Sequence, residues 1–178
     1  TDYLDRAPPE MARAIYSASR ERSVGLGVMG FHSFLQARGL PFEGAMAKSW
    51  NMRIFKHVSA SVNEASMLLA TERGACPDAE ERGVMERFSC KTAIAPTASI
   101  SIICGGTSAC IEPIPANIYT HKTLSGSFSI RNPHLEKLLT EKAKNSEAVW
   151  NSILEQGGSV QHLDFLSSEE KDTFETSF

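Results

Sequence analysis

The spacing of apolar residues along the chain predicts several amphipathic helices. The longest pattern lies in residues 43–73, where one apolar stripe recurs every three or four positions: Trp50, Ile54, Val58, Val62, Ala65 and Leu69. Gly74 follows the stripe as a helix stop, and Pro77 cannot continue a helix. The pattern therefore predicts one long helix that ends at about residue 73.

Shorter helices are expected on both sides of the long one. Before it, apolar spacing predicts helices over residues 8–22 and 25–38, the first beginning at two prolines, and after it a short helix over about 78–87. Further along, Asn132-Pro133 begins a helix that runs to about Lys144. Two more helices are expected, one over 146–155 and one beginning at the capping box Ser167-Ser168-Glu169-Glu170.

Fewer strands than helices are expected. Thr92-Ala93-Ile94-Ala95 is a short apolar run that suits a buried strand, and residues 160–163 could form a second short one. Beyond Pro115 the chain is expected to be irregular up to about residue 131, with a polar loop over 123–127. The prediction is a helix-rich α/β chain.

A glycine motif in the N-terminal part resembles a dinucleotide-binding fingerprint. Residues 25–30 read G-L-G-V-M-G, which fits G-x-G-x-x-G. The fingerprint requires a preceding strand and an acidic residue about 20 positions further on. Here an arginine-rich helical pattern precedes the motif, position 50 is Trp50, and the nearest acidic residue is Glu43. We therefore reject a nicotinamide site and expect the glycines to let a helix approach a neighbouring backbone closely.

The segment after residue 95 carries the strongest chemical signal. Pro96 ends the expected strand because it has no N–H to donate, and the small hydroxyl residues that follow favour a helix start. A strand, a tight turn and a helix start leave backbone N–H groups free to bind phosphate. Between Thr92 and Thr120 only Glu112 is formally charged, so neutral donors would hold such an anion. The alternative is a capped helix that packs in a core.

Composition limits the other function classes. The chain has 178 residues, 42% of them hydrophobic and 22% charged, which suits a soluble globular chain of one to one and a half domains. A net charge of −3 gives no reason to expect nucleic acid or a membrane as partner. No apolar run approaches the roughly 18 residues of a membrane span, and the first ten residues, TDYLDRAPPE, do not resemble a signal peptide. The chain has no initiator Met and stops directly after a charged helical pattern, so we expect a fragment of a longer polypeptide.

The four cysteines give no metal or redox signature. They lie at positions 76, 90, 104 and 110, without a C-x-x-C pair or zinc-type spacing, so no metal site is predicted. Without an export signal we expect free thiols in a reducing cytoplasm. Cys104 and Cys110 lie near the candidate phosphate turn, yet buried, inert thiols are the expected state.

Several separated segments resemble the large, catalytic subunit of ribonucleotide reductase. They are R-S-V-G-L-G-V-M-G-F (22–31), N-E-A-S-M-L-L-A-T-E-R-G-A-C-P-D (63–78) and A-P-T-A-S-I-S-I-I-C-G-G-T-S-A-C-I-E-P-I-P-A-N (95–117). Two further blocks, T-H-K-T-L-S-G-S-F (120–128) and S-V-Q-H-L-D-F-L (159–166), point to the bacterial class Ia subunit. The similarity covers nearly the whole chain in the same order.

The resemblance implies a fold. The family's catalytic domain is a ten-stranded α/β barrel made of two five-stranded halves, and residues 1–178 would supply part of its C-terminal half. Within that fragment we expect a helical part (8–87), a strand with the phosphate loop (91–104) and a mixed loop and helical part (105–178).

The resemblance also implies a substrate site. In the family, the loop that matches Pro96, Thr97, Ala98, Ser99 and Ile100 binds the diphosphate of a ribonucleotide through backbone N–H groups and hydroxyls at a helix start. Thr97 and Ser99 would contribute hydroxyls, whereas Ala98 and Ile100 could contribute only N–H groups. Position 98 is acidic in some relatives, so no side-chain role is expected of Ala98.

The implied reaction replaces the 2′-hydroxyl of a ribonucleoside diphosphate with hydrogen by a thiyl-radical mechanism, supplying deoxyribonucleotides for DNA replication. The radical comes from a metal-containing small subunit, thioredoxin or glutaredoxin supplies electrons, and the large subunit forms a homodimer that binds ATP or dNTP effectors outside this segment. None of the four cysteines matches a catalytic one, so no catalytic residue, metal or cofactor is assigned to this segment and the isolated chain is expected to be inactive. A cobalamin-dependent class II segment and a non-catalytic helical binding module are the alternatives.

Overall fold

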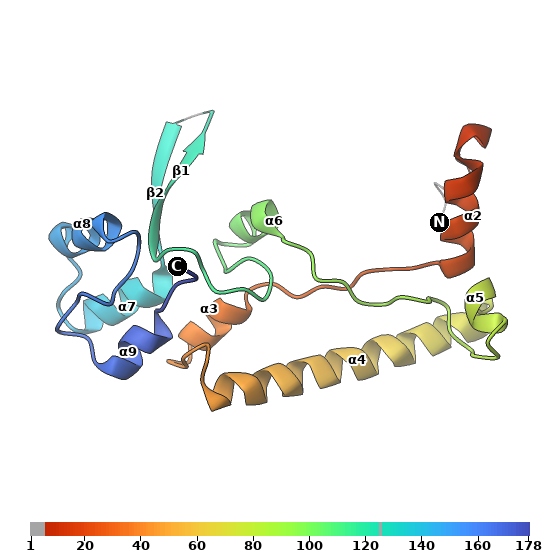
Figure 1. The fold of residues 1–178 in the computed structure, drawn as a ribbon, viewed down its shortest axis with the longest axis horizontal. Coiled ribbons are helices and arrows are strands. Elements are labelled where there is room, and N and C mark those ends of the chain that lie inside the picture. The colour runs from red at the N-terminus through yellow and green to blue at the C-terminus, as the bar shows by residue number, and fades with distance from the viewer. Residues whose placement is uncertain (1–5, 125) are drawn as a thin grey trace. The chain divides into compact units, whose positions relative to one another are not determined.

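The computed structural model describes residues 6–124 and 126–178. In chain order its elements are η1 (Pro9–Met11), α2 (Ala12–Glu21), α3 (Phe31–Gln36), α4 (Ala45–Arg73), α5 (Pro77–Glu80), α6 (Ala98–Ile103), β1 (Ile118–Thr123), β2 (Gly126–Arg131), α7 (Pro133–Glu141), α8 (Glu147–Glu155) and α9 (Ser168–Thr173) (Figure 1). Two compact units form. The first contains the residues up to Gly27 and Asn51–Ala95, and the second contains Val28–Trp50 and Pro96–Phe178.

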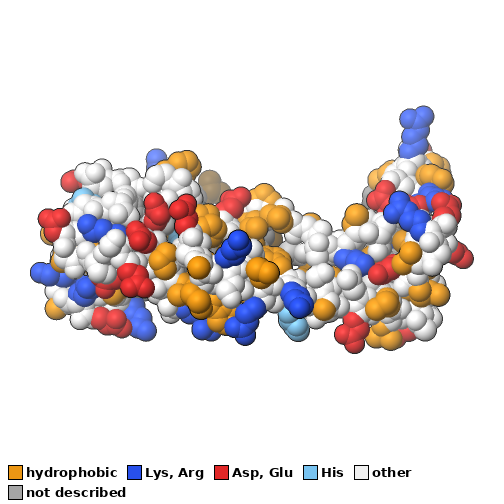
Figure 2. Space-filling model, turned by 60° about the horizontal axis from the view of Figure 1, so that its bottom comes forward, with side chains coloured by type: hydrophobic (Ala, Val, Ile, Leu, Met, Phe, Trp, Pro, Cys, Tyr) orange, Lys and Arg blue, Asp and Glu red, His pale blue; other side chains and the backbone are white. Residues whose placement is uncertain are grey.

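The long helix predicted from the apolar stripe is confirmed. Helix α4 runs over Ala45–Arg73, and Gly74, with φ +83°, follows it. Every stripe residue except Ala65 is partly shielded from solvent. Large apolar side chains outside the stripe, such as Met52 and Leu68, are more than half exposed, and Figure 2 shows hydrophobic side chains between charged ones on the face in view. No helix in the described part of the chain is long and apolar enough to cross a membrane.

Two extended segments pair in the first unit. The N–H of Val24 donates to the carbonyl of Cys90 at 2.9 Å, and the N–H of Ala93 donates to the carbonyl of Leu26 at 3.1 Å. These bonds flank a single parallel bridge between Leu26 and Thr92. The predicted strand at 92–95 is therefore reduced to a single bridge residue, Thr92, and the prediction that the segment is buried is wrong as well, since Ile94 is 72% exposed.

The predicted helix over 25–38 is wrong in its first part, because α3 begins only at Phe31. A Cβ on Gly25 would lie 2.7 Å from the Cβ of Ala93, and one on Gly27 would lie 2.8 Å from the Ala93 carbonyl oxygen. The glycines thus allow a close backbone approach, as predicted, but the approaching segment is extended. The pairing with residues 90–93 replaces the helix here.

Helices α7, α8 and α9 lie together in the second unit (Figure 1) and enclose its apolar core. The core consists of buried residues from these helices, from β1 and from the loops between them: Ile118, Leu135, Leu139, Trp150, Ile153, Val160, Leu163, Leu166 and Phe174. The helices begin where the sequence predicted. Asn132 caps α7, Ser146 caps α8, and the capping box of Ser167 and Glu170 begins α9.

Three other predictions need correction. Residues 118–123 and 126–131 pair as antiparallel strands, with Ile118 opposite Arg131, where an irregular chain was expected; Ser125 of the predicted polar loop lies outside the described residues. These two hairpin strands bury almost no side chain, so no apolar alternation marks them. Residues 160–163 form a turn closed by the N–H of Leu163 and the carbonyl of Val160, at 3.1 Å, instead of a strand. Helix α5 ends at Glu80, and a turn at Gly83, with φ +67°, replaces its expected continuation to 87.

Candidate functional site

The five residues of the predicted phosphate loop, Pro96–Ile100, lie together at the start of α6. Thr97 occupies the N-cap position in the left-handed conformation, with φ 49° and ψ 24°, and no side chain caps the helix. Ala98, Ser99 and Ile100 are exposed. The N–H groups of a first helical turn have no acceptor within the helix, so this turn presents uncapped donors beside an exposed Ser99 hydroxyl. Such a group of neutral donors suits a phosphate.

The Thr97 hydroxyl has a structural partner that the sequence did not reveal. Its oxygen accepts a hydrogen bond from the backbone N–H of Cys110, with 2.8 Å between the two heavy atoms. A hydroxyl that accepts one bond keeps its own hydrogen to donate. Thr97 therefore ties the loop to the chain after α6 and can still donate to a ligand. The helix start that the hydroxyl residues after Pro96 predicted is present, but the Thr97 hydroxyl bonds the Cys110 N–H and does not cap α6.

Residues near Cys110 are held by helix α3. The N–H of Ser33 donates to the Ser108 hydroxyl at 3.1 Å, and the N–H of Ser108 donates to the Ser33 hydroxyl at 2.8 Å. The N–H of Gly30 also donates to the Ser108 carbonyl at 2.8 Å. The N–H of Ile114 donates to Nδ1 of His32 at 3.0 Å. The segment behind the loop is thus anchored on both sides of Cys110.

A cavity of about 250 Å³ opens beside the loop. Ala98, Ser101 and Ile102 of α6 line it, together with Tyr119 and Arg131 of the hairpin. Arg131 brings a positive charge into a region whose own sequence carries almost none. Two other groups engage its guanidinium: one nitrogen lies 2.7 Å from each carboxylate oxygen of Glu147, and its central carbon lies 5.1 Å from the centre of the Trp150 ring.

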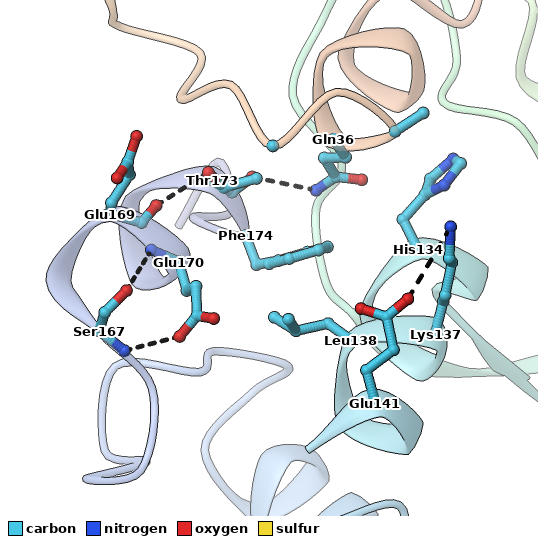
Figure 3. Close-up of a pocket in the computed structure, with 12 residues that line it drawn as sticks. Gln36, His134, Lys137, Leu138, Glu141, Ser167, Glu169, Glu170, Thr173 and Phe174 are labelled. Carbon is cyan, nitrogen blue, oxygen red and sulfur yellow. Dashed lines mark hydrogen bonds and ion pairs between the residues drawn. The ribbon is translucent and has the colours of Figure 1, made fainter.

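A larger cavity, of about 520 Å³, lies away from the phosphate loop, between α3, α7 and α9 (Figure 3). Leu138 and Phe174 point toward one another across it, and polar side chains surround them. Most of these polar groups have structural tasks: Ser167 and Glu170 form the capping box of α9, and the Gln36 amide reaches the Thr173 carbonyl at 3.5 Å. The size of this cavity alone gives no reason to move the candidate site here.

Burial sets the charge state of the histidines near the site. His32 is fully buried, and this burial lowers its pKa to about 4, against an opposing effect of the Thr173 carbonyl and with a further decrease caused by nearby His134. Its Nε2 makes no hydrogen bond to any described residue. Burial, with a smaller effect of Lys137, also lowers the pKa of His134. His32 is therefore neutral near pH 7, which its Nδ1 requires in order to accept the Ile114 N–H.

The cysteines divide into two groups. Cys110 is buried, as predicted, but Cys104 is exposed, so the prediction of burial is wrong for Cys104; of the other two, Cys76 is buried and Cys90 is exposed. Cys104 is exposed because it follows the last turn of the short, solvent-facing α6. Within the described ranges, no three His, Cys, Asp or Glu side chains gather as a metal site would require.

Comparison with known proteins decides the family. The sequence matches the family described as ribonucleotide reductase, barrel domain, over residues 4–86 and 78–178. The chain belongs to this family. The fold expected from the sequence, a helix-rich part of the family's α/β barrel, is thereby confirmed.

Individual relatives agree with this membership. The chain is 43% identical to the ribonucleoside-diphosphate reductase large subunit of Invertebrate iridescent virus 6, over all of this chain and 19% of the relative. It is 45% identical to the same subunit of Invertebrate iridescent virus 3, over 98% of this chain and 28% of the relative. A solved structure, the α subunit of a class Id ribonucleotide reductase from Actinobacillus ureae, is 38% identical, with a TM-score of 0.88 over 98% of this chain and 32% of its own. The chain therefore spans about a fifth to a third of the length of these relatives.

The structure brings together all five predicted site residues but adds partners that sequence reasoning missed. Pro96–Ile100 are contiguous, so their proximity was certain, whereas the roles of Ser33, His32 and Ser108 were not recognised. Ser33 and Ser108 are 75 positions apart, and His32 and Ile114 are 82 apart. Residues so far apart along the chain follow no helical or strand periodicity, so the sequence pattern could not predict that either pair is in contact.

Proposed function

We propose that this chain is the part of a ribonucleoside-diphosphate reductase large subunit that holds the diphosphate of the substrate. The observation that carries the proposal is the uncapped, exposed first turn of α6 after a left-handed Thr97, at the residues where the family resemblance predicts phosphate binding. The relatives are named as reductases of ribonucleoside diphosphates, which gives the chemical class of the substrate.

The loop would bind by neutral donors rather than by ion pairs. The first-turn N–H groups of Ala98, Ser99 and Ile100 have no side-chain cap, and they would donate to a phosphate at the helix start together with the hydroxyls of Thr97 and Ser99. Each donor contributes a charge-assisted hydrogen bond to a phosphate oxygen. Because the N–H groups belong to the backbone, the alanine at position 98 costs the site nothing.

The reaction itself we assign to the complete large subunit. There, a cysteine thiyl radical outside this segment would take the 3′ hydrogen of the ribose, and the 2′-hydroxyl would leave as water. A cysteine pair would supply the hydrogen that replaces it and be oxidised to a disulfide, and the first cysteine would return its hydrogen to C3′ and become a radical again. The radical-generating small subunit, thioredoxin or glutaredoxin, the homodimer and the ATP or dNTP effectors belong to this proposal, and so does the bacterial class Ia. The four free cysteines of this segment agree with a reducing cytoplasm. The segment contributes binding and no reacting group.

Titration of the complete polypeptide that carries this chain with CDP, CMP and cytidine tests the diphosphate site. We expect affinity to fall in that order, because phosphate contacts are lost stepwise. Ser99→Ala removes one hydroxyl donor and should weaken CDP binding about tenfold while leaving cytidine binding unchanged. Ser129→Ala, on the exposed strand β2, is the matched control and should leave CDP binding unchanged. Equal affinity for CDP and cytidine would contradict the proposal.

A further inference from the structure

We propose that Ser33 and His32, both on helix α3, are positioning residues that hold the phosphate loop in its binding conformation through the segment 108–114. Neither side chain is part of the loop. The inference rests on the proposed diphosphate site and adds the support on which that site depends.

The first step is the backbone conformation of the loop. Thr97 and Cys110 both adopt the left-handed region, with φ 49° and φ 50°, which is unfavourable for residues with a Cβ, most of all for a β-branched threonine. The two residues meet at one hydrogen bond, from the Cys110 N–H to the Thr97 hydroxyl, at 2.8 Å. Such strained conformations persist only where the surroundings enforce them, and they cluster at ligand-binding sites. The loop therefore needs an external support.

The second step identifies that support. Cys110 is buried and lies between two anchors on α3. Two residues before it, Ser108 exchanges a reciprocal pair of hydrogen bonds with Ser33, at 3.1 and 2.8 Å. Four residues after it, the Ile114 N–H donates to His32 at 3.0 Å. With both flanks fixed, the Cys110 N–H is directed at Thr97.

The third step is that α3 is itself rigidly held. The side-chain Oε1 of Gln36 accepts from Nδ2 of Asn132 at 3.0 Å, and the same nitrogen donates to the side-chain Oδ1 of Asn117 at 2.8 Å. The Asn117 amide in turn donates to the carbonyl of Phe174 at 2.8 Å. All three side chains are buried. This network joins α3 to the apolar core of α7–α9, so the loop is fixed to the best-packed part of the unit.

A double-mutant cycle in the complete polypeptide tests the positioning role. Thr97→Val removes the hydroxyl with little change in shape, and we expect it to weaken CDP binding about tenfold. Ser33→Ala should weaken CDP binding about fivefold by itself. Because Ser33 acts through Thr97, the double variant should bind no more weakly than Thr97→Val alone. Thr71→Val, on the exposed side of α4, is the matched control for the threonine change and should leave binding unchanged.

Histidine 32 gives a second, independent measurement. His32→Asn keeps an acceptor oxygen close to the position of Nδ1, whereas His32→Leu keeps only volume. We expect His32→Asn to restore most of the CDP affinity that His32→Leu loses, and the loss to appear in KM more than in kcat. Equal losses in the two variants would contradict the positioning role of this residue.

The outcomes separate this inference from the proposed function. If the unsubstituted protein binds CDP and the effects of Thr97→Val and Ser33→Ala multiply, Ser33 does not act through Thr97 and the inference is wrong while the proposed function stands. If the unsubstituted protein does not bind CDP above cytidine, the proposed function fails and the inference fails with it.

Discussion

Two regions of the second unit are held together in different ways. The helices α7–α9 enclose an apolar core that includes Leu135, Leu139 and Trp150, all fully buried. The segment that carries the phosphate loop buries few large side chains and is fixed by single hydrogen bonds to α3. A small change in one side chain of the apolar core leaves the other core contacts in place. Removal of one hydrogen-bonding group from the support of the loop instead frees the residue that it held, and the next residue loses its position as well. The first region gives the unit its stability, and the second sets the geometry of the site.

Of the substitutions proposed here, Trp150→Ala should have the largest effect on stability, and it tests the division between the two regions. The indole is fully buried and donates from Nε1 to the side-chain Oδ1 of Asn145 at 2.8 Å. We expect the free energy of unfolding to fall by about 3–5 kcal/mol, measured by urea denaturation, because a large cavity remains. Below the onset of unfolding, CDP affinity should stay unchanged. Phe178→Ala, at a 97% exposed position, is the control and should change neither quantity.

The CDP affinity of Trp150→Ala can also contradict the division between the two regions. If folded Trp150→Ala protein bound CDP as weakly as the Ser33→Ala variant, the core would contribute to the site geometry directly. The two regions would then act as one cooperative structure.

The difference between the regions explains what sequence reasoning could and could not predict. Apolar burial is repeated at helical spacing, so α4, α7 and α8 were predicted to within a few residues, and the capping box of Ser167 was recognised from its residue types. The hairpin over 118–131 buries almost no side chain and therefore left no pattern. The candidate phosphate loop was predicted from consecutive residues, and a helix, α6, does begin there, while phosphate binding itself stays a prediction.

The contacts of Ser33 and His32 that hold the loop could not be predicted from the sequence, for a physical reason. A reciprocal bond between Ser33 and Ser108 depends on two backbones that meet only after the chain has folded. Serine is common at exposed positions, so its presence alone gives no sign of such a bond. His32 was not recognised either, because an isolated histidine in an apolar helix has no distinguishing neighbours in the sequence.

The acid sensitivity of His32 is the next largest expected effect. Burial lowers its pKa to about 4 from an ordinary 6.5, so the unfolded chain binds the proton first as the pH falls. Stability is therefore complete above pH 6.5 and decreases as the pH falls from 6.5 toward 4, by about 3 kcal/mol from this group. The ring faces His134 from α7, which adds to the decrease, and the Thr173 carbonyl from α9, which opposes it.

Urea denaturation at several pH values measures this effect, with His32→Asn as the comparison. The variant lacks the titrating ring, so the pH dependence that it loses between 6.5 and 4 belongs to His32. Titration of carboxylates such as Glu170 remains in both proteins and cancels in the difference, which therefore reports the His32 ring together with its interaction with His134. Identical pH profiles for the two proteins would show that His32 does not link the α3 anchor to acid stability.

Loss of the capping box of α9 should have the smallest effect on the free energy of unfolding, and it tests whether stability can change without any change in CDP affinity. The Ser167 hydroxyl accepts from the Glu170 N–H at 3.3 Å, while the Glu170 carboxylate accepts from the Ser167 N–H at 2.7 Å. Ser167→Ala should lower the free energy of unfolding by about 1 kcal/mol, because one N–H of the first turn loses its acceptor. Ser168→Ala, one position inside the helix, is the matched control and should change stability much less. Since the capping box belongs to the core region, CDP affinity should be the same in both variants. A weaker CDP affinity in Ser167→Ala alone would show that helix α9 also helps to place the loop.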